Sequence, residues 1–205
     1  HDQLHAVSCR FVNLSAILSY VHPAITLGIV LAVACAAAIY CCAYPIPARS
    51  ADMTQVIQNY YSGRQDAPSQ IAVRSSIALG GREYYLIELD GSFGRATLQT
   101  GLFGRRRLTH IGCGGNFADG IVEANGKHYL VIGMRDFAEE VETITATIAG
   151  ETYELRAGGN SGYILSHTEV SPFVEDNHID LSCIKLYNAS GTDITANYSL
   201  HGGGI

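Results

Sequence analysis

No charged residue occurs between Ala24 and Tyr44, and this apolar stretch constrains the chain more than any other feature. About 20 apolar residues in an α-helix, at 1.5 Å each, cross about 30 Å of hydrocarbon. A helix of this length in a soluble core normally shows a polar face, and this stretch shows none. The sequence therefore predicts one membrane-spanning helix within residues 20–45, in contact with lipid.

Prolines define the predicted ends of this helix. Pro23 suits the first helical position, where its missing N–H is not needed, and Pro45 and Pro47 cannot continue a helix. A cleaved signal peptide is the main alternative, but its apolar region normally has only about 7–15 residues and ends in a small-residue cleavage site. We therefore predict an uncleaved signal anchor after a short N-terminal tail, residues 1–19.

The orientation of the span rests on the C-terminal part, because Arg10 and Arg49 balance each other on its two sides. Residues 51–205 contain two cysteines, Cys113 and Cys183. A cysteine pair in a β-rich domain is typical of one disulfide outside the cytoplasm. We therefore predict a Cys113–Cys183 disulfide and an extracytoplasmic domain, and two buried free thiols are the alternative.

Composition limits the partners of this domain. Residues 51–205 contain 18 acidic and 11 basic residues, a net charge near −7. Phosphate contacts need a basic face, so the sequence predicts no nucleic-acid partner. The chain has 22 glycines, 12 tyrosines and no tryptophan, which is typical of a turn-rich β domain.

A linker and one short helix are predicted within residues 46–66. Asp52 has the character of an N-cap for a helix over Met53–Tyr61, and Gly63 is suited to end it. Four residues are expected to share the buried face of this helix: Met53, Val56, Ile57 and Tyr60.

From residue 67 to 205 the sequence predicts short strands joined by tight turns. Gly80-Gly81, Asp90-Gly91, Asn125-Gly126 and Ala149-Gly150 are the predicted two-residue turns. We expect a mainly β domain, an antiparallel sandwich or barrel, and disorder only in the glycine-rich tail His201–Ile205. The expected strands are Ile71–Leu79, Glu83–Leu89, Gly94–Gln99, Arg106–Ile111, Ile121–Glu123, His128–Ile132, Val141–Ile148, Thr152–Leu155, Tyr163–Thr168, Leu181–Tyr187 and Ile194–Leu200.

Arg105, Arg106 and Arg107 form the one basic cluster and are the candidate ligand-binding residues. Three guanidinium groups together suit an anionic ligand, an acidic polymer or lipid headgroups. Side chains alternate between faces along a strand, so the three cannot all point the same way in regular β structure. A solvated hairpin tip is therefore the alternative.

Other segments with chemical potential favour structural roles. The glycines of 112–116 are not followed by a helix that would complete a phosphate cradle, so a tight bend is favoured. The loop 175–180 lacks the spacing of a calcium-binding loop, and no pair of histidines has metal-ligand spacing. No metal, cofactor or catalytic residue is predicted, although Cys113 beside a histidine is a conceivable nucleophile. The histidines considered are His110, His128, His167, His178 and His201.

Four segments carry a family resemblance: Gly94–Leu98, Gly101–Arg105, Gly112–Phe117 and Lys127–Gly133. In these segments the chain resembles uncharacterised single-pass membrane proteins of Gram-positive bacteria of the Bacillus and Paenibacillus type. Such proteins join an N-terminal anchor to a small extracytoplasmic β domain. The resemblance implies a topology and a location but no activity.

We therefore expect a membrane-anchored, extracytoplasmic domain of the cell envelope that binds or senses a ligand, or assists an envelope protein as its partner. A pilin-like filament subunit is one alternative, although the apolar helix lacks an early glutamate. An envelope hydrolase with an unrecognised site is the other.

Overall fold

A computed structural model describes residues 14–48, 52–157, 159–160, 162–171 and 179–204. The chain divides into two compact units, His1–Pro45 and Ile46–Ile205. Within the first unit, α1 (Leu14–Ala43) contains the segment Ile25–Ala43, which is long and apolar enough to cross a membrane and has no buried side chain.

The described limits of α1 differ from the prediction at one end. The helix ends at Ala43, before Pro45, as predicted. Pro23 lies inside the helix rather than at its start, and residues 14–19 are helical rather than a tail. A proline removes one backbone hydrogen bond, and the helix-forming residues on both sides of Pro23 continue the helix across that gap.

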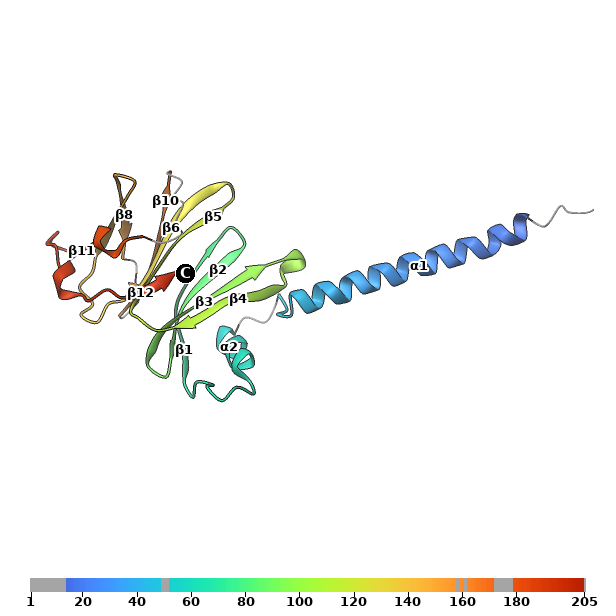
Figure 1. Ribbon diagram of the computed structural model, residues 1–205, viewed down its shortest axis with the longest axis horizontal. Helices are drawn as coiled ribbons and strands as arrows, with labels where there is room; N and C mark the ends of the chain where they lie inside the picture. Colours follow the sequence, from blue (N-terminus) through green and yellow to red (C-terminus); the bar gives the residue numbers. More distant parts are fainter. Residues whose placement is uncertain (1–13, 49–51, 158, 161, 172–178, 205) are drawn as a thin grey trace, which may run out of the picture. The chain divides into compact units, whose positions relative to one another are not determined.

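The second unit is mainly β, as predicted, and its described strands form three sheets that do not close into a barrel (Figure 1). β12 pairs in parallel with β5, and the other described pairs are antiparallel. The first sheet has the order β1 (Ile71–Leu79), β2 (Arg82–Leu89), β3 (Ser92–Thr100), β4 (Arg106–Cys113). The second has the order β12 (Gly202–Gly204), β5 (Phe117–Ala124), β6 (Lys127–Arg135), β10 (Tyr163–Val170), β9 (Gly159–Asn160). The third has the order β11 (Ile184–Tyr187), β7 (Thr143–Ile148), β8 (Glu151–Arg156).

The three sheets pack face to face as successive layers. Tyr84, Leu86 and Phe93 of the first sheet bury against Val131 and Leu165 of the second. The opposite face of the second sheet, with residues such as Leu130 and Ile132, packs on Ile144 and Leu155 of the third. The second sheet is therefore buried between the other two.

All four predicted two-residue turns are confirmed. Both central residues of each turn have positive φ, as a type I′ hairpin turn requires. The turn residues are Gly80-Gly81, Asp90-Gly91, Asn125-Gly126 and Ala149-Gly150.

The short helix α2 (Met53–Tyr61) covers the outer face of the first sheet (Figure 1). Asp52 caps it, since its carboxylate accepts a hydrogen bond from the Thr54 N–H at 2.9 Å. Met53, Val56 and Ile57 are buried as predicted. The prediction for Tyr60 was wrong: it is exposed, and its neighbour Tyr61 packs against the core instead.

Two C-terminal segments also differ from the expected structure. Ile194–Leu200 was predicted as a strand, but Thr195–Asn197 forms a 3-10 turn, η3, because the Asp193 carboxylate accepts hydrogen bonds from the N–H and hydroxyl of Thr195. The tail was expected to be disordered, but Gly202–Gly204 pairs with Phe117–Asp119 of β5. Glycine supplies no side chain that would signal this pairing in the sequence.

The predicted Cys113–Cys183 disulfide is not formed, and both residues are free thiols. Cys113 ends β4 opposite Gly94, on the side of the first sheet that faces α2. Cys183 lies in η2 (Leu181–Cys183), beside the core between the second and third sheets. A disulfide needs Cα atoms within about 7 Å, whereas packed sheets lie about 10 Å apart. The order of the layers therefore keeps the two thiols apart.

Candidate functional site

The three predicted ligand-binding arginines do not share one surface. Arg106 is largely buried, and its Nη1 lies 3.1 Å from Glu83 Oε2. Arg107 points to the other side of β4, where Nε and Nη2 donate to Gln99 Oε1 at 3.0 and 2.7 Å. Arg105 precedes the strand, at the end of the 3-10 turn η1 (Leu102–Gly104). The alternation of β4 separates the charges of this cluster, which counts against one shared site. Ligand binding by these arginines stays a prediction.

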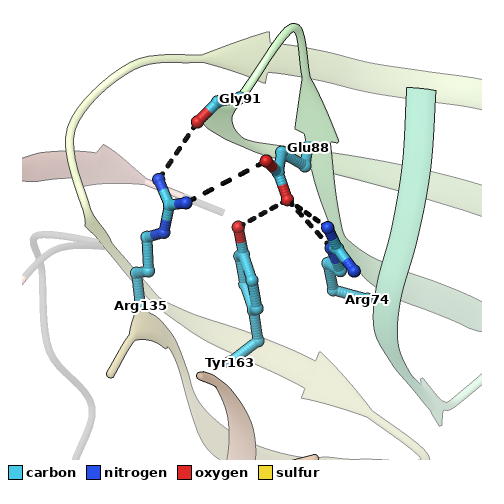
Figure 2. A network of polar contacts seen from close by, with 5 residues as sticks. All are labelled: Arg74, Glu88, Gly91, Arg135 and Tyr163. Carbon is cyan, nitrogen blue, oxygen red and sulfur yellow. Dashed lines mark hydrogen bonds and ion pairs between the residues drawn. The ribbon is translucent and has the colours of Figure 1, made fainter. Parts of the chain in front are cut away.

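A second cluster of charges joins the first two sheets (Figure 2). It consists of Arg74, Glu88, Arg135 and Tyr163, and we call it the Glu88 network. Arg74 and Glu88 come from β1 and β2 of the first sheet, whereas Arg135 and Tyr163 come from β6 and β10 of the second. The network is therefore assembled only when the two sheets pack.

Local backbone features aim each side chain at Glu88. Between Val73 and Ser75 the register of β1 shifts against β2, so Arg74 is the extra residue of a β-bulge. A bulge turns its extra residue out of the regular alternation, and the Arg74 side chain reaches Glu88 on the neighbouring strand. Arg135 and Tyr163 are direct cross-strand partners at the ends of β6 and β10, which places both side chains on the same face.

Three hydrogen bonds converge on one oxygen of Glu88. Arg74 donates from Nε at 2.9 Å and from Nη2 at 2.6 Å to Oε2, and the Tyr163 hydroxyl donates to the same atom at 2.9 Å. The other oxygen, Oε1, lies 3.9 Å from Arg135 Nη2. Arg135 Nη1 donates to the Gly91 carbonyl at 3.0 Å, in the turn between β2 and β3 (Figure 2).

These contacts set the charge states of the network. Hydrogen bonds from Arg74 and then from Tyr163 lower the pKa of Glu88, so the carboxylate is ionised at neutral pH. Burial and the bond to Glu88 raise the pKa of the Tyr163 phenol, so it stays protonated. Neither group is therefore suited to exchange a proton near neutrality, and the arrangement suits binding better than general acid–base catalysis.

The network carries more positive than negative charge and adjoins an exposed aromatic ring. Two guanidinium groups face one carboxylate, and both stack near the Tyr163 ring, at 5.4 Å for Arg74 and 5.5 Å for Arg135. Arg135 also lies 4.9 Å from the centre of the Phe137 ring, which is 67% exposed. A cation beside an exposed aromatic ring suits a ligand that presents an anionic group next to apolar surface.

The sequence did not indicate the Glu88 network. Its residues lie in four strands of two sheets, and the turn signals that predicted strands did not indicate which side chains meet between sheets. The bulge at Arg74 has no local sequence signature of the kind that Gly-Gly or Asn-Gly provides for a turn.

Other predicted sites have structural roles or lie outside the described residues. The bend at Gly112–Asn116 is confirmed: Gly114 and Gly115 have positive φ where the chain passes from β4 to β5. Positions 175–178 of the proposed polar loop, with His178, are outside the described residues. Among the residues that the structure describes, no group of three His, Cys, Asp or Glu side chains is arranged to hold a metal ion.

Comparisons with protein-family models, with curated proteins and with solved structures found no match to this chain.

Proposed function

We propose that this chain is a membrane-anchored binding or accessory domain of the cell envelope, with residues 46–205 outside the cytoplasm. One observation carries the anchor: Ile25–Ala43 is an apolar helix with no buried side chain, ahead of a β unit that has cores of its own. Soluble proteins rarely expose so large an apolar surface. In a bilayer the same helix satisfies its own backbone hydrogen bonds and buries its side chains in lipid.

Extraction of membranes at alkaline pH tests the anchor. An integral protein stays in the pellet at the full mass of the chain, whereas a cleaved signal sequence releases a smaller, soluble product. Release of residues 46–205 without the helix would refute the anchor.

Cys113 provides the test of location, because it is exposed and free. A membrane-impermeant maleimide should label the protein in intact cells without prior reduction, and this labelling should fall in Cys113→Ser to what the partly exposed Cys183 gives. Labelling of Cys113 that requires permeabilised cells would place the domain in the cytoplasm. That result would refute the location and leave the anchor intact.

The binding role rests on Arg135 and Phe137 at the edge of the Glu88 network. We infer a partner that presents a carboxylate or phosphate beside an apolar group. A photo-crosslinking amino acid in place of Phe137 should give a discrete product in cells, and Arg135→Ala should reduce it. The matched control places the same amino acid at Lys185, which is also exposed and lies in β11 of the third sheet. Equal products from both positions would contradict this surface.

A further inference from the structure

The tip of the β3–β4 hairpin presents two large apolar side chains to solvent. Leu102 and Phe103, in η1, are 68% and 89% exposed. Among the large apolar side chains of the described residues, Phe103 is the most exposed. It also has a φ of 55°, in the left-handed region that an aromatic residue rarely adopts. The ring is not part of any of the three cores of the unit.

The strand that follows this tip is paired with the segment that begins the second unit. The Ile46 N–H donates to the Arg106 carbonyl at 3.0 Å, and the Arg106 N–H donates to the Ile46 carbonyl at 2.9 Å. A Cβ at Gly104 would lie 3.2 Å from Ala48 Cβ, so residues 46–48 run close beside the tip. The exposed side chains are therefore fixed to the first residues of the β unit.

Only Tyr44 and Pro45 separate Ile46 from Ala43, the last residue of α1. An extended residue spans at most about 3.6 Å, so covalent connection alone keeps Ile46 within about 11 Å of Ala43. This step rests on the proposed function, in which Ile25–Ala43 crosses a bilayer. In that case the hairpin tip cannot be far from the membrane surface, whatever the tilt of the helix.

We propose that Leu102 and Phe103 insert into the interfacial zone of the bilayer that α1 crosses. Apolar side chains leave water when they enter this zone, and the short tether makes the contact intramolecular, so a weak affinity is sufficient. Arg107 is exposed on the adjoining strand and is suited to lipid phosphate. The backbone N–H and C=O groups of the turn need hydrogen bonds from water or protein, which the hydrocarbon core does not supply, so only the side chains insert and the insertion is shallow. Residues 51–205 as a whole have a net charge near −7, which disfavours a broader contact with anionic lipid.

The chain contains no tryptophan, so Phe103→Trp introduces a single tryptophan at the tip, and its emission can be excited apart from that of the 12 tyrosines. The full chain is reconstituted into vesicles of phosphatidylcholine and phosphatidylglycerol, with or without brominated phosphatidylcholine, which quenches tryptophan on contact. The matched control is Phe137→Trp, an exposed phenylalanine in the loop after β6. We expect blue-shifted emission and several-fold stronger quenching for Phe103→Trp than for Phe137→Trp.

Flotation of the same vesicles separates the two proposals. If the protein floats and neither tryptophan is quenched, the tip does not enter the bilayer, and the anchor stands. Equal quenching of both tryptophans would also overturn the inference, because it would mean that the domain lies broadly on the surface. If the protein does not float with the vesicles, the proposed anchor fails, and the inference fails with it.

Discussion

Replacement of Glu88 by glutamine tests whether the Glu88 network holds the first two sheets together. The side chain of Glu88 is only 16% exposed, and Oε2 accepts two hydrogen bonds from Arg74 and one from Tyr163. Hydrogen bonds to charged groups contribute about 1.5–3 kcal/mol, whereas exposed ion pairs contribute about 0.2–1 kcal/mol. Arg74 is partly exposed, which screens the pair. We therefore expect Glu88→Gln to lower the free energy of unfolding by about 1–2 kcal/mol at neutral pH.

The stabilisation that Glu88 provides should depend on pH. The pKa of Glu88 is lowered in the folded protein from its ordinary value of 4.5. The stabilisation is therefore complete above pH 4.5 and is lost as the pH falls through the folded-state pKa. Below that pKa the protonated carboxyl is neutral like the amide, so the difference between wild type and Glu88→Gln should disappear.

Urea unfolding of the full chain in detergent micelles, followed by near-ultraviolet circular dichroism, measures this difference across the pH range. The control is Glu169→Gln, because Lys127 and Glu169 form an ion pair at 2.7 Å in which both side chains are more than half exposed. That variant should unfold like the wild type. A loss in Glu88→Gln that does not change with pH, or no loss at neutral pH, would refute the reasoning.

Three further predictions concern the interior of the β unit. Gly133→Ala should lower the free energy of unfolding by about 1–3 kcal/mol, because a Cβ there would lie 2.6 Å from Leu86 Cδ2. Thermal unfolding measures this loss, and the loss should be smaller when Gly133→Ala is made in a Leu86→Ala variant. Asp136→Ala leaves the Tyr198 hydroxyl without its carboxylate acceptor and should cost about 1–3 kcal/mol in urea unfolding, and an unchanged midpoint would contradict this. Burial raises the pKa of Tyr85 to about 12. The difference between the titrations of wild type and Tyr85→Phe should therefore show one phenol that ionises well above pH 10. Ionisation of that phenol near pH 10 would count against the burial of Tyr85.

Several elements of this fold could be predicted because their causes are local. The turn at Asn125-Gly126 needs only two adjacent residues that tolerate positive φ. The Asp52 cap and the buried residues Met53, Val56 and Ile57 lie within one short helix. The apolar helix Ile25–Ala43 is likewise a property of consecutive residues.

The sequence was less informative wherever a neighbour distant in the chain decided the structure. Tyr60 and Tyr61 are adjacent tyrosines, and only the position of the first sheet selects Tyr61 for burial. The cysteine count favoured a disulfide, but the order of the three sheets places Cys113 and Cys183 in different layers.

By itself, the sequence determined an apolar helix, a short capped helix, and a mainly β unit with four type I′ turns. Only the tertiary structure decided where the charges of that unit meet. The bulge at Arg74 and the cross-strand pair of Arg135 and Tyr163 act on Glu88 because two sheets pack face to face. The same structure dispersed the consecutive arginines at 105–107, because successive residues of a strand point to opposite faces. Contacts within a turn are set by neighbouring residues, whereas contacts between sheets depend on how the whole chain folds.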